Sequence, residues 1–365
     1  MTPHVLVTTV DSRAPGGVAA YWNAVRPILP PPVDYLTVGR RDGERGALRI
    51  AGRIASDWRR LRSTIGACRY DLVHLNPSLG AKALARDALS LLLVRRAGIP
   101  VLVFFHGWDE PTEASLAGPL GPIFERTFLQ ADAVIVLARK FERKLRSLGY
   151  ARPIHVTTTA VPEEAFSVAP REDGGRGVRL LYLSRFEPQK GAVETVRAFA
   201  LLKRRHPDLT LTLAGTGSDL PRVAETIGRL GVRDVILSGH VSGAAKDRVF
   251  SEADIFVFPT TFGEGMPTVV LEAMAKGLPV VTRPVGGVAD FFESGRMGYA
   301  TERSEPEEIA LLIERLVAAP EARYAMGAYN REFARRNFHA SVVADRLTAI
   351  YEETAAAATA GRAGR

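Results

Sequence analysis

The stretch Phe262-Gly-Glu-Gly-Met-Pro-Thr-Val-Val-Leu-Glu-Ala-Met-Ala-Lys-Gly-Leu-Pro-Val-Val281 indicates the architecture of this chain. It follows an apolar run, Ile255–Phe258, and ends inside a second one, Val280–Thr282. Between these runs, a glycine-rich loop leads into a helix expected from about Pro267 to Lys276, which Gly277 ends. A buried strand, a helix and a second buried strand in this order predict a right-handed βαβ unit, and therefore a parallel sheet.

The same alternation of short apolar runs and helical patterns continues along the chain. The other runs expected to be strands are Val5–Thr9, Asp34–Val38, Leu72–Leu75, Val101–Phe105, Ala133–Leu137, Ile154–Thr157, Arg179–Leu183, Leu209–Ala214 and Val235–Ser238. Their weak polar alternation is typical of strands buried on both faces. Because the pattern restarts after 161–177, which is rich in proline, glycine and charge, we interpret that stretch as a linker. The sequence predicts an α/β protein with two doubly wound parallel-sheet domains, 1–165 and 178–338, facing a ligand-binding cleft.

Composition limits the class of protein. The 365 residues, 46% hydrophobic and 24% charged, are typical of a globular protein with two domains. The single cysteine, Cys68, excludes an intramolecular disulfide and a cysteine-based zinc site, and it fits a reducing compartment. The first residues lack the features of a signal peptide, and no apolar run approaches the roughly 20 residues of a spanning helix. We therefore expect a cytoplasmic protein.

The positive charge is concentrated in the first half of the chain. Residues 1–160 carry 22 Lys/Arg against 13 Asp/Glu, a net charge of +9, whereas residues 161–365 carry 26 against 27, a net charge of −1. Residues 47–66 of the basic half contain one apolar helical stripe, formed by Ile50, Ile54, Trp58, Leu61 and Ile65. The arginines expected on the other faces are Arg49, Arg53, Arg59, Arg60 and Arg62.

Two interpretations of this basic helix stay open. It packs on the first sheet with a solvated basic surface, or it also docks to the anionic cytoplasmic face of a membrane as a peripheral protein. Aromatic residues do not interleave with the basic ones as a stacking surface for nucleic acid requires, so no nucleic-acid partner is expected.

Two glutamates of the first-quoted stretch are candidate ligand contacts. The expected first helical turn, 266–269, leaves backbone N–H groups unpaired at the positive end of the helix dipole, which favours a diphosphate. Glu272 lies about one turn deeper and can accept hydrogen bonds from a ribose, and Glu264 in the loop can reach a sugar. Taken singly, both glutamates could be solvated surface charges, but the strand, glycine-rich loop and helix around them favour a binding site.

The stretch resembles the Glu-x7-Glu signature of the retaining glycosyltransferases of family 4, the glycosyl transferases group 1. Further family landmarks occur in the right order along nearly the whole chain, at Pro15–Val18, Val103–Gly107, Arg179–Gly191 and Leu213–Gly217. The resemblance implies a GT-B fold of two Rossmann-like domains, with the donor mainly on the second and the acceptor mainly on the first. It also implies that a last helix, about 340–358, packs back on the first domain. The family's Asn-Gly-Val-Asp segment near the domain crossover is replaced here by Thr158–Pro162.

The resemblance also implies roles for individual residues. Arg185 and Lys190 would hold the donor diphosphate, where fixed cations stabilise the charge that grows on the leaving group. Gly16 and Gly17 would let the backbone approach the phosphates, and His106 would contact the transferred sugar or the acceptor, with a purely structural histidine as the alternative. The remaining expected phosphate contacts are Gly265, Met266, Pro267 and Thr268.

The sequence contains no Asp-x-Asp pair and no Cys/His cluster with zinc spacing, so we expect neither a metal nor another cofactor. These observations predict a retaining hexosyltransferase that uses a nucleotide-diphosphate sugar, with an acceptor in glycan or glycolipid biosynthesis, such as that of cell-surface polysaccharide. A nucleotide-sugar epimerase of the same fold and a non-catalytic nucleotide-sugar sensor or scaffold are the alternatives. A dehydrogenase is disfavoured because Leu220 replaces the third glycine after Gly215-Thr-Gly217.

Overall fold

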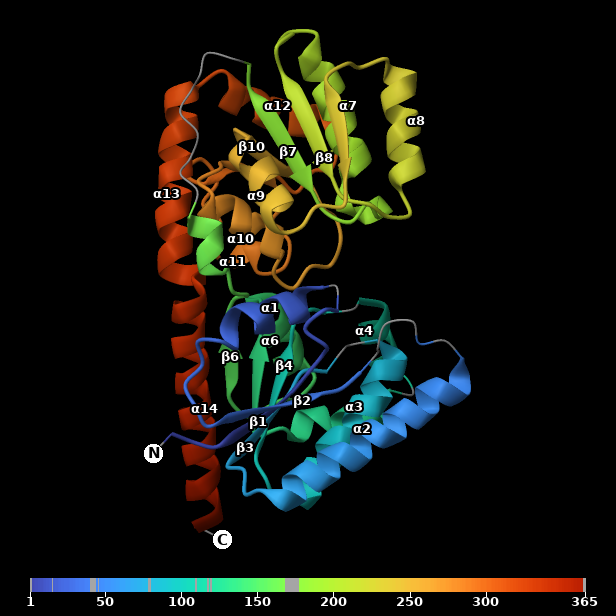
Figure 1. Cartoon of the computed structure of the whole chain (residues 1–365), viewed down its shortest axis with the longest axis vertical. Helices are drawn as coiled ribbons and strands as arrows, with labels where there is room; N and C mark the ends of the chain where they lie inside the picture. Colours follow the sequence, from blue (N-terminus) through green and yellow to red (C-terminus); the bar gives the residue numbers. More distant parts are fainter. Residues whose placement is uncertain are drawn as a thin grey trace. The chain divides into compact units, whose positions relative to one another are not determined.

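The computed structural model of the chain describes residues 2–14, 16–39, 44, 46–77, 80–108, 110–116, 118, 120–167 and 177–363. The chain divides into two units (Figure 1). Unit 1 contains Met1–Ala160, Gly263–Met266 and Ala340–Arg365, and unit 2 contains Val161–Phe262 and Pro267–His339. Most of the predicted linker, residues 168–176, lies outside the described residues.

The division differs from the predicted domain limits in two places. The first unit ends at Ala160 instead of 165, because Val161 already pairs with unit 2: its N–H donates to the Phe338 carbonyl at 2.8 Å. Residues 263–266, which we predicted in the second domain, belong to unit 1, where Met266 packs against a hydrophobic cluster of that unit.

The described residues of unit 1 form a parallel sheet with the strand order β2-β1-β3-β4-β5-β6. The strands are β1 (Val5–Thr9), β2 (Val33–Thr37), β3 (Leu72–Leu75), β4 (Val101–Phe105), β5 (Ala133–Val136) and β6 (Ile154–Val156). The helices are α1 (Gly17–Val25), α2 (Ala47–Ala67), α3 (Ala81–Arg96), α4 (Glu110–Leu116), α5 (Gly121–Arg126), α6 (Arg139–Ser147) and α14 (Ala340–Ala363), with a 3-10 turn, η1 (Phe128–Gln130).

The core of unit 1 lies on both faces of this sheet. Alternate side chains of a strand point to opposite faces, so Val101, Val103 and Phe105 of β4 join one hydrophobic cluster, and Leu102 and Phe104 join the other. The first cluster includes residues of α2, α3, α5 and α6, and the second includes residues of α1 and α14. This two-sided burial explains why the strands read as continuous apolar runs.

Unit 2 contains a second parallel sheet, with the strand order β12-β11-β10-β7-β8-β9. The strands are β7 (Arg179–Leu183), β8 (Thr210–Ala214), β9 (Val235–Gly239), β10 (Ile255–Phe258), β11 (Val280–Thr282) and β12 (Gly298–Ala300). The helices are α7 (Ala192–Lys203), α8 (Leu220–Leu230), α9 (Gly243–Ser251), α10 (Thr268–Ala275), α11 (Val288–Phe291), α12 (Pro306–Val317) and α13 (Pro320–Phe338), with the 3-10 turns η2 (Glu163–Phe166) and η3 (Pro188–Lys190).

The predicted doubly wound α/β fold is confirmed, and the ends of all the predicted strands lie within one residue of the observed ones. The prediction missed β12, because Gly298-Tyr-Ala300 has no β-branched residue; its pairing with β11 makes it a strand. The last helix, predicted to span about 340–358, continues to Ala363.

Each sheet has one point at which the order of strands reverses. In unit 1, β2 and β3 lie on opposite sides of β1, so the reversal falls between β1 and β3. In unit 2 it falls between β7 and β10. Ligands of open α/β sheets bind outside the carboxyl ends of the strands at such a point. The loops that follow β1, β3, β7 and β10 are therefore the places where ligand-binding residues are expected.

A buried hydrogen bond ties α14 to the sheet of unit 1. His74 Nδ1 in β3 and Tyr351 Oη in α14 are 2.8 Å apart, and both side chains are buried. The rings of Trp22 and Phe104 lie 5.3 and 5.9 Å from the His74 ring. Burial, and to a smaller extent the neighbouring His106, lowers the pKa of His74 well below its ordinary value, so the folded chain holds a neutral imidazole.

We predict that unit 1 loses stability in mild acid because His74 is buried in its neutral form. The pKa of His74 is lower in the folded chain than in the unfolded chain, so only the unfolded chain gains a proton as the pH falls below about 6.5. The free energy of unfolding therefore decreases with pH in that range, by about 2 kcal/mol between pH 7.5 and 5.0 for one such imidazole.

Urea unfolding followed by tryptophan fluorescence measures this effect in unit 1, because all three tryptophans, Trp22, Trp58 and Trp108, lie in that unit. His74→Phe should reduce the difference between the midpoints at pH 7.5 and 5.0. The control His240→Asn, at an exposed position of unit 2, should keep the wild-type difference. An equal pH dependence in wild type and His74→Phe would contradict the prediction.

Candidate functional site

Arg185 and Lys190 lie after β7, at the reversal point of the unit 2 sheet. Arg185 is exposed, whereas Lys190, in η3, is only 5% exposed. The Lys190 ammonium lies 4.0 Å from the centre of the Phe262 ring, in the loop that follows β10. This loop is also joined to η3 by hydrogen bonds, since Thr261 N and Thr260 Oγ1 donate to the Gln189 carbonyl at 2.8 and 3.1 Å. The structure therefore holds the loops after β7 and β10 together.

The turn Gly215-Thr216-Gly217 after β8 fixes the position of the Arg185 loop. Phe186 N donates to the Thr216 carbonyl at 2.9 Å, and Asp219 N donates to the Phe186 carbonyl at 2.8 Å. A Cβ atom at Gly215 would lie 1.8 Å from the Ser184 carbonyl oxygen, and one at Gly217 would lie 2.2 Å from the Phe186 carbonyl oxygen. The two glycines are thus needed for direct packing of backbone on backbone beside Arg185.

Glu272 lies in α10, and only one of its two carboxylate oxygens has a hydrogen-bond partner among the described residues. Its Oε1 accepts a hydrogen bond from Lys246 Nζ of α9 at 2.6 Å, and its side chain is 12% exposed. Its Oε2 is buried and has no hydrogen-bond partner among the described residues. Since buried carboxylate oxygens are normally paired, this oxygen is an acceptor available to a ligand hydroxyl.

The helix α10 begins at Thr268, one residue later than predicted. Gly265 and Met266 therefore precede the helix, and Pro267, which has no N–H, is its N-cap residue, with no side-chain cap. Val270 N donates to the Pro267 carbonyl at 3.0 Å, whereas Thr268 N and Val269 N have no backbone acceptor among the described residues. These two N–H groups are the ones that α10 can offer to an anion.

In unit 1, Gly16 and Gly17 follow β1 at the reversal point of the first sheet. Both are exposed, and a Cβ atom added to either would meet nothing within 4 Å. Gly16 has a φ of 126°, which side chains rarely adopt. Packing against the described residues therefore does not explain why glycine stands at these two positions. The open space beside them could be occupied by a ligand. Pro15 lies outside the described residues.

His106 follows β4 and is held by aromatic and polar neighbours. Its ring stacks on Phe104 with the centres 3.7 Å apart, and the edge-on Tyr21 ring lies 5.3 Å away. Its Nε2 lies 2.7 Å from Asn76 Oδ1. Burial lowers the pKa of His106 to about 3, so the imidazole is neutral near pH 7. Asn76 is not among the predicted site residues, although it is a polar residue directly after a buried strand, which was a usable signal.

The Glu264 loop lies against His106 in the same unit. A Cβ atom at Gly265 would lie 2.2 Å from the His106 carbonyl oxygen, so only glycine permits this approach. Glu264 is half-buried and Met266 packs against the cluster that contains Tyr21. The structure therefore brings together His106, Glu264 and Gly265 in unit 1, and Arg185, Lys190, Thr268 and Glu272 belong to unit 2.

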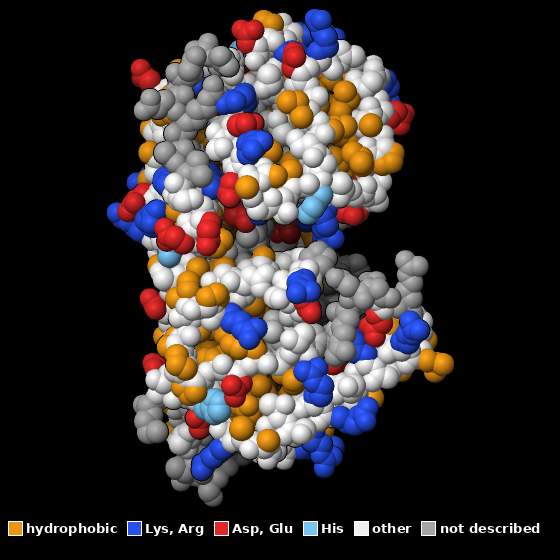
Figure 2. Space-filling model, viewed as in Figure 1, with side chains coloured by type: hydrophobic (Ala, Val, Ile, Leu, Met, Phe, Trp, Pro, Cys, Tyr) orange, Lys and Arg blue, Asp and Glu red, His pale blue; other side chains and the backbone are white. Residues whose placement is uncertain are grey.

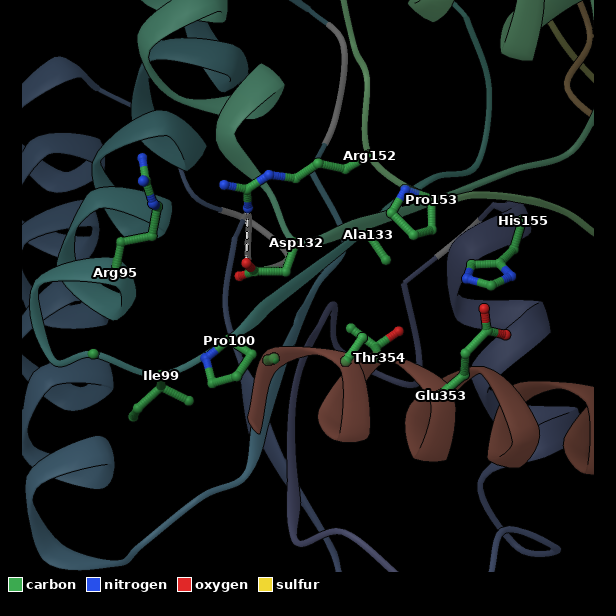
Figure 3. Close-up of a pocket in the computed structure, with 13 residues that line it drawn as sticks. Arg95, Ile99, Pro100, Asp132, Ala133, Arg152, Pro153, His155, Glu353 and Thr354 are labelled. Carbon is green, nitrogen blue, oxygen red and sulfur yellow. Dashed lines mark hydrogen bonds and ion pairs between the residues drawn. The ribbon is translucent and has the colours of Figure 1, made fainter. Parts of the chain in front are cut away.

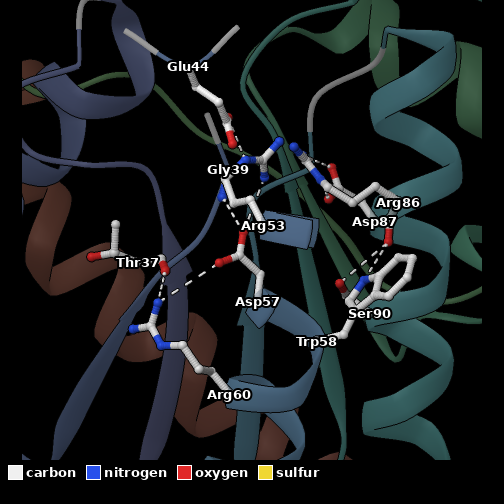
Figure 4. A network of polar contacts seen from close by, with 10 residues as sticks. All are labelled: Thr37, Gly39, Glu44, Arg53, Asp57, Trp58, Arg60, Arg86, Asp87 and Ser90. Carbon is white, nitrogen blue, oxygen red and sulfur yellow. Dashed lines mark hydrogen bonds and ion pairs between the residues drawn. The ribbon is translucent and has the colours of Figure 1, made fainter. Parts of the chain in front are cut away.

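The basic helix α2 agrees only partly with its predicted faces. Leu61 is buried and Ile65 packs against the core, but Ile50 is 39% exposed. Arg53, predicted on another face, points inward: its Nε bonds Glu44 at 2.7 Å and its Nη1 bonds Asp57 at 3.2 Å (Figure 4). Asp57, which is buried and also accepts the Gly39 N–H at 3.0 Å, draws this arginine in.

The larger cavities of the described residues do not coincide with these loops. One of about 530 Å³ lies at the amino ends of β4, β5 and β6, beside α14, with Asp132, Arg152, His155 and Glu353 in its lining (Figure 3). Another, of about 740 Å³, lies in unit 2 around the end of α7 and the residues that join α8 to β9. Neither is lined by a predicted site residue.

Within the described parts of the chain, no group of three or more His, Cys, Asp or Glu side chains is placed to hold a metal ion. None of the described helices is long and apolar enough to cross a membrane.

Two family models match the chain. Residues 4–162 match the glycosyl transferase 4-like domain, and residues 170–333 match the glycosyl transferases group 1. Phosphatidyl-myo-inositol mannosyltransferase of Mycobacterium tuberculosis is 28% identical over 311 residues, which cover 81% of this chain and 77% of the relative. Alpha-D-kanosaminyltransferase of Streptomyces kanamyceticus is 28% identical over 314 residues, which cover 81% of this chain and 79% of the relative.

Solved structures share the fold. Alr3699/HepE of Anabaena, solved in complex with UDP-glucose, has a TM-score of 0.73 and 18% identity, covering 96% of this chain and 99% of that one. Sucrose-phosphate synthase of Thermosynechococcus elongatus has a TM-score of 0.77 and 18% identity, and the match covers 97% of this chain and 99% of that one.

The close packing at Gly215 generates a prediction with a matched control. In Gly215→Ala the new methyl group would collide with the Ser184 carbonyl, so the loop 184–187 should open and unit 2 should lose about 3 kcal/mol of stability. Gly228→Ala, in α8 and with no neighbour within 4 Å, should stabilise by up to about 1 kcal/mol. Hydrogen–deuterium exchange of peptides covering 180–220 should be faster only in Gly215→Ala. Equal exchange in both variants would contradict the packing argument.

Proposed function

Because the chain belongs to the group 1 glycosyltransferases, we propose that it is a retaining hexosyltransferase that works without a metal ion in glycan or glycolipid biosynthesis. The chain is a glycosyltransferase of the GT-B fold that uses a nucleotide-sugar donor. The observation that carries the finer proposal is the grouping of Arg185, Lys190 and the half-satisfied Glu272 on the loops and helix that follow β7 and β10.

We assign the nucleotide part of the donor to unit 2. Arg185 and Lys190 would contact the diphosphate through charge-assisted hydrogen bonds, and the Thr268 N–H would add a backbone donor. The free Oε2 of Glu272 would accept a hydrogen bond from a ribose hydroxyl, while Lys246 keeps the other oxygen occupied. Gly16 and Gly17, with open space above them, would admit the phosphates to the backbone of unit 1.

The proposed reaction needs no carboxylate nucleophile. The bond between the anomeric carbon and the diphosphate oxygen breaks, and its electron pair stays on the diphosphate. The acceptor oxygen then bonds to the anomeric carbon on the same face, and its proton passes to a leaving phosphate oxygen. Fixed cations at Arg185 and Lys190 would stabilise the growing negative charge in the transition state, which is the role that a metal ion fills elsewhere. Glu264 and the neutral His106 would hold hydroxyl groups of the transferred sugar.

For the acceptor we propose a lipid-linked molecule or glycan reached at the cytoplasmic face of a membrane. The exposed side of α2 combines apolar and basic residues: Leu48 is 90% exposed and Ile50 is 39% exposed, and Arg49, Arg59, Arg60 and Arg62 are exposed as well. Figure 2 shows Lys and Arg side chains along the edge of unit 1 where α2 lies. Such a surface favours an anionic leaflet. One relative is named for a phosphatidyl-myo-inositol acceptor, which supports the same proposal.

An epimerase and a sensor are less well supported. Both curated relatives described above are named as transferases. An epimerase would convert the donor to an isomer without any acceptor, whereas the proposed enzyme needs one.

The donor site predicts a defined binding experiment. Calorimetric titration of the protein in EDTA with UDP-glucose, GDP-mannose and ADP-glucose should give binding of one nucleotide class. Lys190→Ala and Glu272→Gln should each weaken it about 10- to 100-fold, because each loses a hydrogen bond to or from a charged group. Arg204→Ala, at an exposed position of unit 2, is the control and should bind as wild type does. Absence of binding to all three donors would contradict the donor site, and a strict need for Mg²⁺ would contradict the metal-independent mechanism.

The surface of α2 predicts membrane binding. In flotation experiments, the protein should bind vesicles that contain phosphatidylglycerol and not vesicles of phosphatidylcholine alone, and added salt should weaken the binding. Leu48→Ser combined with Arg59→Ser should reduce it several-fold. Leu230→Ser, which replaces a 43% exposed leucine of unit 2, is the matched control. Equal flotation of the α2 variant and wild type would refute this docking surface.

A further inference from the structure

A chain of two hydrogen bonds links the carboxyl ends of three neighbouring strands in unit 1. Asn76, directly after β3, donates from its Nδ2 to the carbonyl of Thr8 in β1 at 2.7 Å. Its Oδ1 lies 2.7 Å from Nε2 of His106, directly after β4. Asn76 therefore connects the reversal point of the sheet to His106.

These contacts determine which nitrogen of His106 carries the proton. A backbone carbonyl oxygen only accepts hydrogen bonds, so the amide NH₂ of Asn76 must face Thr8. The amide oxygen then faces His106, and because that oxygen also only accepts, Nε2 must be the donor. In the neutral imidazole the other nitrogen, Nδ1, then has no proton and can only accept.

The ring has little freedom to change this arrangement. Phe104 stacks on one face at 3.7 Å between centres, and the Tyr21 ring meets it at 72°. The His106 side chain remains partly exposed, and no described residue forms a hydrogen bond with Nδ1. Nδ1 is thus the atom of this ring that a ligand can use.

We propose that Asn76 is a positioning residue that fixes His106 as a hydrogen-bond acceptor, so that Nδ1 accepts a hydrogen bond from one hydroxyl of the transferred sugar. The inference rests on the proposed contact between His106 and the transferred sugar. A hydroxyl has a proton to donate to Nδ1. A deoxy sugar that lacks this hydroxyl has none, so it would lose the hydrogen bond and leave Nδ1 without a partner.

The first test measures the proton on His106 directly and does not depend on activity. Nitrogen-15 NMR of the full chain labelled at its seven histidines, with His106 assigned from His106→Asn, should show a protonated Nε2 and an unprotonated Nδ1 at pH 7.5. Asn76→Leu should increase the share of the form protonated at Nδ1, towards the mixture of an unconstrained neutral imidazole. Asn23→Leu is the matched control, since Asn23 also donates its amide to a backbone carbonyl in unit 1, that of Ser12, at 2.9 Å. A protonated Nδ1 in wild type, or an unchanged signal in Asn76→Leu, would overturn the proposal.

The second test compares the intact sugar donor with monodeoxy donors that each lack one hydroxyl, for the nucleotide class that binds. With wild type, kcat/KM should fall at least about tenfold for one of the deoxy donors, as loss of one such hydrogen bond implies. Asn76→Leu should reduce this loss for the same donor, and Asn23→Leu should keep it. An equal loss in Asn76→Leu and wild type would overturn the positioning role, whereas absence of any donor binding would instead refute the proposed function and leave the NMR result standing.

Discussion

Backbone packed directly on backbone, at glycines that leave no room for a Cβ atom, holds the loops at the carboxyl ends of both sheets. Gly215 and Gly217 press against the loop that carries Arg185, Gly191 meets Pro259 after β10, and Gly265 meets the His106 carbonyl. Each contact joins loops that follow different strands. Side chains with rotatable bonds would make such contacts longer and looser, so these glycines are what allow short polar loops to keep charged and neutral groups in defined positions.

Much of the fold was predictable because the relevant signals are local. The strands are short, apolar and buried on both faces, and glycine or proline separates them from the helices, so the run that contains Glu264 and Glu272 already indicated a strand, a loop and a helix. The exception, β12, has no local signal, since pairing with β11 is what makes it a strand.

The partners of the site residues were not predictable, because they lie far from them in the sequence. Lys246 and Glu272 are 26 residues apart, and Asn76 and His106 are 30 apart, so only the folded sheet shows which of many polar side chains meet. Arg53 shows the same limit: its helical position was clear, but its inward direction depends on Glu44 and the buried Asp57. For the same reason the number of arginines in the first half overstates the basic groups that its surface can offer, because inward arginines such as Arg53 and Arg86 are paired with acidic neighbours.

The course of the chain through its two units has a consequence for synthesis on the ribosome. Unit 1 takes its first 160 residues from the beginning of the chain and α14 from the end, whereas almost all of unit 2 is continuous. While translation proceeds, the part of the first sheet around His74 and Phe104 that α14 covers stays exposed until α14 emerges, after unit 2. Unit 2 can form its core earlier than unit 1. The nascent chain therefore passes through a stage in which unit 2 is folded and unit 1 still exposes apolar surface. Chaperones bind intermediates of this kind.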